Sequence, residues 1–359
     1  MPAMDLPMRI TRLREAAALE ASDSLYVTAS PNIRYLSGFH GSAGVLVVTA
    51  RNAILITDGR YEEVAREQCQ SSGVEIIAEP SDQHSEIIGK ILSGSKRLLL
   101  DPGQISMDAY SQLKSSLPDV DIAYARQIIE HLRLTKDAGE IARIRAACGI
   151  ALQAFEQVSG WLAEHIAERS IAHRLEALMK ELGAEDIAFS TIVASGPNSA
   201  KPHHQPGERV PEEGEPVIID FGAVVDGYCS DITRTVWIGE LRGEYRPMYE
   251  AAVAAHAAGI EAIRAGVSHS DVDAVCRRTF ENLGFTDKPL HPSGHNVGLS
   301  IHERPFLASY ASEAIGAGYV LTVEPGLYRP GVGGFRVEDT LLAQESRSVV
   351  LSSSARTEP

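Results

Sequence analysis

The sequence predicts two domains, an α/β domain followed by a larger domain in which helices and strands alternate. Short apolar segments alternate with helical segments between about residues 25 and 120, which is typical of an α/β domain. A long amphipathic helix is then predicted to begin near Ala138, and beyond it apolar strands that end in Asp or Glu lie between further amphipathic helices. The polar segment 133–137 separates the two patterns, so the expected domains are residues 1–132 and 133–359.

The predicted elements follow from the spacing of the apolar residues. In the first domain, five short apolar runs bounded by turn residues are expected to be strands, and residues 61–70 are expected to form one of the helices. In the second domain, Ile141, Ile144, Ala147 and Cys148 lie at helical spacing. The expected strands of the first domain are 25–28, 45–49, 53–57, 74–77 and 97–100, and the further helices of the second are 171–182, 248–265 and 270–283.

Composition limits the class of protein. The chain of 359 residues is 44% hydrophobic with a formal net charge of −15, which argues for a globular protein without a nucleic-acid-binding surface. The four cysteines form no C-x-x-C pair, so we expect reduced, packed cysteines rather than disulfides or a zinc knuckle. Residues 1–20 do not resemble a signal peptide, and no apolar run is long enough to span a membrane. We therefore expect a soluble, cytoplasmic protein.

Two aspartates lie at the ends of apolar strands, where an unpaired charge is costly. Asp220 ends the apolar run 216–220, which reads as a buried strand. The turn signal Asp226-Gly227 follows, and Asp231 then begins a segment of alternating polar and apolar residues. Asp220 and Asp231 are therefore expected on the two strands of a hairpin.

Three more polar residues occur in similar settings. Glu324 ends the apolar run 319–324 before a Pro-Gly turn, and Glu338 shares one strand face with Arg336 and Thr340. His295 lies in a segment flanked by glycines, which let the backbone turn sharply and leave the imidazole free to reach a metal.

Four carboxylates and one imidazole suit a pair of divalent cations bridged by carboxylates and a hydroxide. Like charges in one site cost free energy unless cations or protons offset them, and two dications carry the charge that four carboxylates neutralise. Taken singly, a strand-end Asp or Glu is more often a turn cap or a salt-bridge partner than a ligand, and a single His is more often a hydrogen-bonding residue. The candidate ligands are Asp220, Asp231, His295, Glu324 and Glu338.

Other catalytic motifs are incomplete. Residues 302–306 begin like the zinc-protease motif H-E-x-x-H, but Phe306 replaces the second histidine and Pro305 would break the helix that the motif needs. Residues 331–336 lack the third glycine of a dinucleotide-binding loop and are expected to form a glycine-rich turn. No serine lies in a G-x-S-x-G motif, and no cysteine has the context of a nucleophile.

Several segments together resemble the metallopeptidase family of prolidases, Xaa-Pro aminopeptidases and methionine aminopeptidases. These enzymes share the pita-bread fold of the creatinase/methionine aminopeptidase superfamily. Residues 33–61 are similar to the small N-terminal domain of the proline-directed members. The matching segments are IIDFGAVVDGYCSDITRT (218–235), SGHNVGLSIHE (293–303), VEPGLY (323–328), FRVEDT (335–340) and the histidine segment IVASGPNSAKPHH (192–204).

The resemblance implies an α/β N-terminal domain, an α+β pita-bread catalytic domain with pseudo-twofold symmetry, and a homodimer. It implies two divalent metal ions, Mn²⁺ first and Co²⁺ or Zn²⁺ as alternatives. In the family pattern Asp220 binds one ion, His295 and Glu324 bind the other, and Asp231 and Glu338 bridge both. A hydroxide between the ions attacks the scissile carbonyl, and Glu324 shuttles the proton to the leaving nitrogen.

The resemblance also implies roles around the metals. His203 and His302 become catalytic and substrate-binding residues, with His204 an adjacent candidate; each could instead hydrogen-bond a metal ligand. Arg336 forms an ion pair either with a carboxylate of the substrate or with the carboxylate of a metal-ligand residue. The expected activity is Xaa-Pro dipeptidase, acting on short proline-containing peptides. An Xaa-Pro aminopeptidase and a non-catalytic binding protein on the same fold are the alternatives.

Two positions depart from the family pattern. Asn296 follows the metal-binding histidine where the family usually has Gly, and we expect Asn to tolerate left-handed backbone there. Val225 stands where a Tyr is common, which predicts a missing hydroxyl near the metals.

Overall fold

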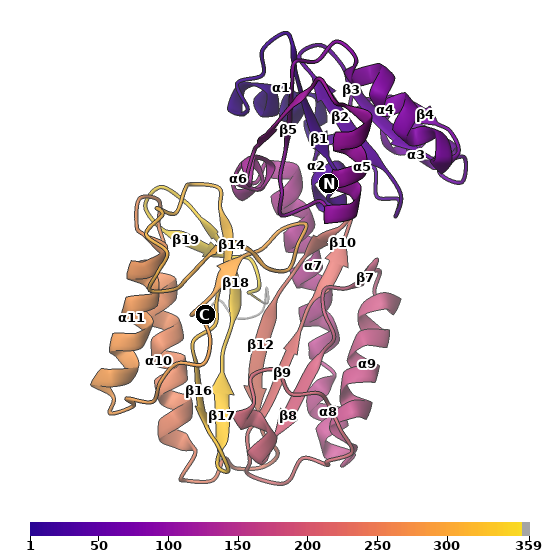
Figure 1. Cartoon of the computed structure of the whole chain (residues 1–359). Coiled ribbons are helices and arrows are strands. Elements are labelled where there is room, and N and C mark those ends of the chain that lie inside the picture. The colour runs from indigo at the N-terminus through magenta and orange to yellow at the C-terminus, as the bar shows by residue number, and fades with distance from the viewer. Residues whose placement is uncertain (354–359) are drawn as a thin grey trace. The chain divides into compact units, whose positions relative to one another are not determined.

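The chain divides into two compact units in the computed structural model, which describes residues 1–353. One unit comprises residues 4–133, and the other comprises residues 1–3 together with the chain from 134 onward (Figure 1). The helices of residues 1–353 include none that is long and apolar enough to cross a membrane. All four cysteines are free and buried, as the sequence predicts.

Unit 4–133 is built on a six-stranded mixed sheet with the order β4-β3-β2-β1-β5-β6. β1 runs antiparallel to β2 and parallel to β5, and strands β2, β3 and β5 contribute fully buried side chains to the core. The strands are β1 (Asp23–Val27), β2 (Val45–Thr49), β3 (Ala53–Thr57), β4 (Glu75–Ala78), β5 (Arg97–Leu100) and β6 (Asp121–Tyr124). The helices are α1 (Leu6–Ala16), α2 (Ser30–Ser37), α3 (Glu62–Gln68), α4 (His84–Leu92), α5 (Met107–Ser116) and α6 (Ile128–Leu134).

The five predicted strands of this unit are confirmed within two residues at each end, and β2, β3 and β5 agree at both ends. The sixth strand, β6, was not predicted because its four residues include only Ile122 and Ala123 as aliphatic residues. β6 is an edge strand next to β5, so pairing with β5 rather than its own pattern makes it a strand.

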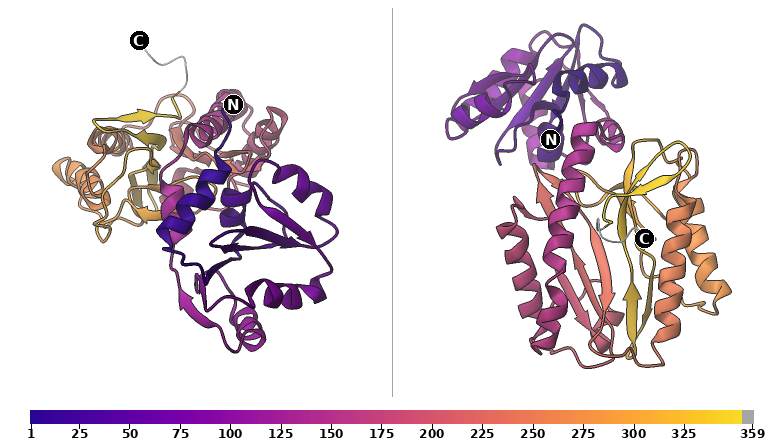
Figure 2. Two further views of the ribbon diagram at one scale, coloured as in Figure 1. Left: turned by 90° about the horizontal axis from the view of Figure 1, so that it is seen from above. Right: turned by 180° about the vertical axis from the view of Figure 1, so that it is seen from behind.

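The second unit consists of two sets of strands, each with long helices along it (Figures 1 and 2). α7 (Ala138–Phe155), α8 (Val158–Ala163) and α9 (Glu168–Glu181) accompany the first set. α10 (Arg246–Ala262) and α11 (His269–Asn282) accompany the second set. These helices confirm the four predicted helical segments, and α8 is an additional helix.

The strands of the second unit form several small sheets. The first set pairs as β12-β9-β8 and β11-β10-β7, and the second as β14-β13-β15-β18-β19 and β16-β17. The first-set strands are β7 (Asp186–Ile187), β8 (Ile192–Ser195), β9 (Val217–Phe221), β10 (Ala223–Val225), β11 (Tyr228–Cys229) and β12 (Ile232–Val236). The second-set strands are β13 (His295–Asn296), β14 (Glu303–Phe306), β15 (Val320–Val323), β16 (Gly326–Arg329), β17 (Gly333–Arg336), β18 (Asp339–Ala343) and β19 (Ser348–Val350).

The predicted hairpin is present, but it is divided into two parts. β9 pairs with β12 so that Asp220 lies opposite Thr233, and β10 pairs with β11 around the turn Asp226-Gly227. Both turn residues have positive φ, 48° for Asp226 and 78° for Gly227, which suits the Asp-Gly pair. The expectation of a turn over residues 331–336 was wrong for its second half, because Gly333–Arg336 forms β17 and pairs with β16.

A capping box fixes the start of α7. The Asp137 side chain accepts a hydrogen bond of 2.8 Å from the backbone N–H of Glu140, and the Glu140 carboxylate accepts one of 2.9 Å from the N–H of Asp137. We expect Asp137→Ala to lower the free energy of unfolding of this unit by about 1 kcal/mol, whereas Asp137→Asn keeps a cap and changes it little. Denaturant unfolding followed by circular dichroism measures both. Equal stability of the two variants would contradict the assignment.

Candidate active site

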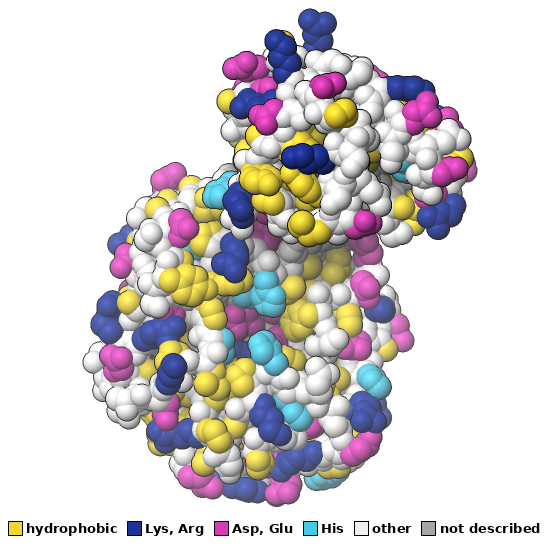
Figure 3. Space-filling model, in the orientation of Figure 1, with side chains coloured by type: hydrophobic (Ala, Val, Ile, Leu, Met, Phe, Trp, Pro, Cys, Tyr) yellow, Lys and Arg dark blue, Asp and Glu magenta, His cyan; other side chains and the backbone are white. Residues whose placement is uncertain are grey.

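The five candidate ligands come from strand ends of both sets and meet in one cavity of about 450 Å³. Figure 3 shows acidic side chains gathered in a hollow of the second unit, with histidines beside them. The first set contributes Asp220 from β9 and Asp231 from the residue before β12. The second set contributes His295 from β13, Glu324 from the residue after β15, and Glu338 between β17 and β18.

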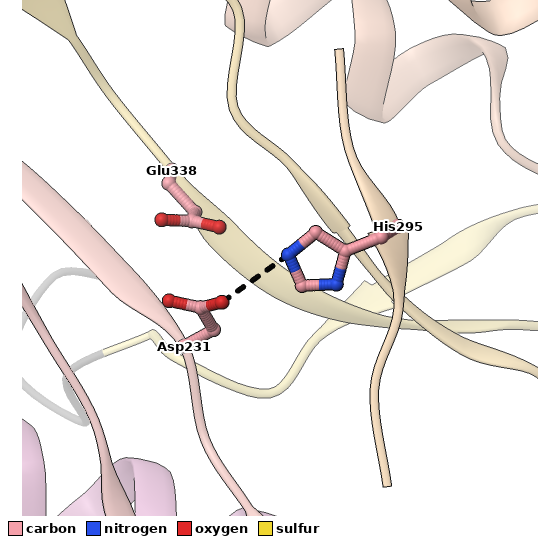
Figure 4. Close-up of side chains that lie close together, drawn as sticks. All are labelled: Asp231, His295 and Glu338. Carbon is pink, nitrogen blue, oxygen red and sulfur yellow. Dashed lines mark ion pairs between the residues drawn. The ribbon is translucent and has the colours of Figure 1, made fainter. Parts of the chain in front are cut away.

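Asp231, His295 and Glu338 form the tightest group (Figure 4). Each offers one ligand atom, and these atoms all lie within 4.8 Å of one another. His295 Nε2 lies 3.3 Å from Asp231 Oδ2 and 3.6 Å from Glu324 Oε1. His295 Nδ1 lies 3.1 Å from the carbonyl oxygen of Asn296, which only accepts, so Nδ1 carries a proton and Nε2 is directed at the carboxylates.

The carboxylates destabilise one another in the metal-free protein. Burial and then the neighbouring Asp220 and Glu324 carboxylates raise the pKa of Asp231 well above its ordinary value. Burial and then Asp231 raise the pKa of Glu338 in the same way, and burial also raises the pKa of Glu324. Asp220 Oδ1 and Glu338 Oε1 are buried and have no hydrogen-bond partner among residues 1–353. Unpartnered carboxylate oxygens beside an imidazole nitrogen are a donor set that fits divalent cations.

Arg336 holds one of these carboxylates in place. Its guanidinium donates hydrogen bonds to Asp220 Oδ2 at 2.6 Å, to the Tyr328 hydroxyl at 2.7 Å and to the Thr233 hydroxyl at 3.1 Å. The side chain is only 3% exposed. Arg336 therefore pairs with a candidate ligand, which was one of the two alternatives that the sequence left open.

Two threonines join the strand sets at the base of the site. The Thr233 hydroxyl of β12 donates to Glu338 Oε2 at 2.7 Å, and the Thr340 hydroxyl of β18 donates to the carbonyl oxygen of Asp231 at 2.7 Å. Each threonine thus bonds the carboxylate residue of the opposite set. This reciprocal arrangement fixes the separation of Asp231 and Glu338.

His203 and His302 line the same cavity as the carboxylates. The His302 ring lies edge-on to His295, with 4.5 Å between the ring centroids. Burial and then His295 lower the pKa of His302 from its ordinary value, so this imidazole is neutral near neutral pH. The apolar part of the wall is formed by Phe189, Ile192, Ile301 and Phe306.

His204 does not line the cavity, although it is adjacent to His203. Its Nε2 lies 2.8 Å from the carboxylate of Glu168, the first residue of α9. The sequence leaves the choice between the two histidines open, and the structure places only His203 at the cavity.

The two departures from the family pattern lie in strands β13 and β10. Asn296 is not in the left-handed region; it lies in β13 and its side-chain amide donates to the carbonyl oxygen of Pro305 at 2.8 Å. Val225 lies in β10 opposite Tyr228 and does not line the cavity.

Two residues of the site were missed by sequence reasoning. The Tyr328 hydroxyl accepts from Arg336 and lies 2.8 Å from His291 Nε2, while His291 Nδ1 lies 2.7 Å from the carbonyl oxygen of Pro292. Burial, followed by Arg336, lowers the pKa of His291 to about 3. Tyr328 ends the matching segment 323–328, which was the available signal, whereas His291 lies in a turn without a pattern.

The structure confirms that residues 302–306 do not form a zinc-protease motif. Glu303 belongs to β14 rather than to a helix, and its carboxylate accepts from the buried Lys136 ammonium at 3.1 Å. Glu303 therefore stabilises the segment next to His302 instead of facing the cavity.

Known proteins resemble this chain over nearly its whole length. The Xaa-Pro dipeptidase of Pyrococcus furiosus is 32% identical over 349 residues, which cover 97% of this chain and 98% of the relative. The solved structure of an Xaa-Pro dipeptidase from Bacillus anthracis superposes with a TM-score of 0.91 at 34% identity, covering 97% and 98% of the two chains. An X-Pro aminopeptidase from Thermotoga maritima superposes with a TM-score of 0.88 at 30% identity, covering 96% and 99%.

Two family patterns match separate parts of the chain. The creatinase/prolidase N-terminal domain matches residues 9–135, and metallopeptidase family M24 matches residues 142–345, which include all five candidate ligands. The chain therefore belongs to metallopeptidase family M24 and carries the N-terminal domain of creatinases and prolidases.

Proposed function

We propose that this protein is an Xaa-Pro dipeptidase, which hydrolyses the bond before proline in short peptides. The observation that carries the proposal is a cavity in which four carboxylates and a correctly oriented imidazole lie beside two further histidines. The similarity to dipeptidases from Pyrococcus furiosus and Bacillus anthracis supports the choice of substrate. The X-Pro bond is a tertiary amide without an N–H, so its hydrolysis calls for a dedicated pocket.

Two divalent ions are the proposed cofactors, with manganese as the first candidate and cobalt or zinc as alternatives. Asp220 would hold one ion, His295 and Glu324 the other, and Asp231 and Glu338 both. The buried, unpartnered oxygens of Asp220 and Glu338 support this assignment. When bound, such ions activate water near neutral pH and polarise a carbonyl group.

The surrounding side chains have separate proposed roles. Glu324 is the most exposed of the four carboxylates, with a side chain 17% exposed against 13% for Asp220 and 7% for Asp231. This exposure towards the cavity suits a group that passes a proton to the leaving nitrogen. His203 and His302 would hold the substrate carbonyl, and neutral His302 can donate one hydrogen bond to it. Arg336 would keep Asp220 oriented rather than bind the substrate.

The test is hydrolysis of Ala-Pro, Ala-Pro-Ala and Ala-Ala by chelator-treated protein with and without added Mn²⁺. Metal-dependent cleavage of Ala-Pro alone supports a dipeptidase. Cleavage of Ala-Pro-Ala as well would favour the aminopeptidase alternative, which the similarity to the Thermotoga maritima enzyme keeps in view. If the protein binds Mn²⁺ but cleaves none of the three peptides, the proposal is wrong.

Arg336→Lys tests the positioning of Asp220. Lysine keeps the positive charge but cannot bond Asp220, Tyr328 and Thr233 at once, so Asp220 loses its fixed orientation. We expect about a 10- to 100-fold loss in metal affinity or in kcat/KM, measured by calorimetry and peptide hydrolysis. Arg329→Lys is the matched control, because Arg329 forms an exposed ion pair with Asp287. Equal behaviour of the two variants would refute the role.

A further inference from the structure

A second buried charged cluster lies outside the metal cluster, next to the segment that carries His203. We call residues 195–209 the His203 loop; it begins with the last residue of β8 and includes the short helix Gly196–Ala200. The centre of the cluster is Glu168, whose side chain is completely buried. A buried carboxylate needs hydrogen bonds or a cation, and Glu168 has no part in the chemistry described above.

The Glu168 carboxylate is bonded to both ends and to the middle of the His203 loop. At the start of the loop, the backbone N–H and the hydroxyl of Ser195 donate to Oε1 at 2.8 and 2.6 Å. Further along, Asn198 Nδ2 lies 3.1 and 3.3 Å from the two oxygens. At the far end, His204 Nε2 lies 2.8 Å and the N–H of Gly207 3.2 Å from Oε2. One side chain thus fixes the loop at four residues.

The backbone of α9 adds two bonds to the same loop. The N–H of Glu168 donates to the carbonyl oxygen of Arg209 at 2.9 Å, and the N–H of Arg169 donates to that of Gly207 at 3.1 Å. These are N–H groups of the first helical turn, which have no partner within a helix. Arg209 also donates to the Ser195 hydroxyl at 2.7 Å and pairs with Glu215, so the two ends of the loop are tied together.

The hydrogen bonds keep Glu168 ionised. Burial by itself raises the pKa of this carboxyl, but the hydrogen bonds from Ser195, Asn198 and His204 outweigh burial and lower the pKa below its ordinary value. An ionised acceptor makes stronger hydrogen bonds than a neutral one, so the attachment of the loop is a strong one.

His203 itself has no comparable support. Within residues 1–353 its side chain makes no hydrogen bond, yet it lines the cavity with Asp220 and His302. Its position therefore depends on the backbone of the loop. The adjacent side chain, His204, points instead to Glu168 and is only 12% exposed. Anchoring His204 restricts the backbone from which His203 extends.

We propose that Glu168 and His204 are positioning residues that hold His203 at the substrate. They act through His203 and touch neither the substrate nor the metals. This inference rests on the proposed function, because it assigns His203 a role in binding the scissile peptide. A displacement of about 1 Å at a substrate-positioning group can cost up to about 100-fold in rate.

A double-mutant cycle between His204 and His203 tests the proposal. We expect His204→Ala to lower kcat/KM for Ala-Pro about tenfold in the native background and less than about twofold in the His203→Ala background. His204→Gln keeps a donor towards Glu168 and should recover most of the loss. Mn²⁺ affinity, measured by calorimetry, should not change in any of these variants. Glu208→Gln is the control, because Glu208 lies on the same loop but is largely exposed.

The same loss in both backgrounds, or no loss in the native background, would overturn the proposal. A readout without activity comes from hydrogen–deuterium exchange of the metal-loaded protein. Glu168→Gln and His204→Ala should speed exchange in residues 195–209 but not in β9 or β12. Unchanged exchange in the loop would show that Glu168 and His204 do not hold it. If wild-type protein cleaves no peptide, the proposed function is wrong, while the exchange experiment still decides whether Glu168 and His204 hold the loop.

Discussion

Asp231→Asn is expected to abolish peptidase activity and, in the absence of metal, to stabilise the fold. In the metal-free protein Asp231 is a buried carboxylate whose pKa is raised by burial and by Asp220 and Glu324, so an isosteric neutral amide removes a repulsive charge. With metal present the same change would remove one of the proposed ligands. We expect kcat/KM for Ala-Pro to fall on the order of 10³-fold or more, the metal-free melting temperature to rise, and the metal-induced increase in melting temperature to shrink.

Lower activity together with higher metal-free stability distinguishes a metal ligand from an ordinary buried acidic residue. Asp226→Asn is the control, since Asp226 lies in the turn of the same hairpin and its side chain is 55% exposed. It should leave activity and both melting temperatures nearly unchanged. A destabilised metal-free Asp231→Asn variant, or one with full activity, would contradict the assignment of Asp231 to the metals.

Stability should depend on pH in opposite ways with and without metal. In the metal-free protein, Asp231, Glu324 and Glu338 have raised pKa values, so the folded state binds more protons than the unfolded state above the ordinary carboxyl pKa of about 4. Their contribution is fully present below that pH and is lost as the pH rises through the folded pKa values. Metal ions need ionised ligands, so their stabilising effect grows over the same range.

The measurement is thermal unfolding between about pH 5 and about pH 8, with chelator and with Mn²⁺. We expect the difference in melting temperature between the two conditions to widen steadily with pH. Combining Asp231→Asn with Glu338→Gln should flatten the pH dependence of the metal-free protein, because two of the three groups no longer titrate. A constant difference across the range would show that the carboxylates do not exchange protons for metal.

Part of the candidate site follows from the sequence because Asp220 and Glu324 lie at the C-terminal ends of apolar strands. Asp220 and Glu324 follow runs of apolar residues that are expected to be buried. An acidic residue is costly to bury there, so its presence indicates a functional role. The strand register then brings the ligands of one set together, as the pairing of Asp220 with Thr233 shows. Local patterns also predict the long helices, whose apolar faces repeat over several turns.

The remaining features depend on contacts between distant segments. His291 reaches Tyr328 across 37 residues, and neither residue has a local pattern that indicates the partner. Asn296 was misjudged because the sequence does not show that β13 continues through it towards β15. Glu168 reads as an ordinary acidic residue in the first turn of a helix, and only the fold shows that it binds a loop 27 to 39 residues away.

The reciprocal threonine bonds determine how much of the chain must be synthesised before the carboxylate cluster is complete. Thr233 bonds the Glu338 carboxylate across 105 residues, and Thr340 bonds the backbone carbonyl oxygen of Asp231 across 109, so these bonds form only when both strand sets are present. A nascent chain on the ribosome therefore carries Asp220 and Asp231 for a long stretch of synthesis without the partners that complete the cluster. Such contacts at long range form late in folding. The cluster is thus incomplete until Glu338 and Thr340 have been synthesised.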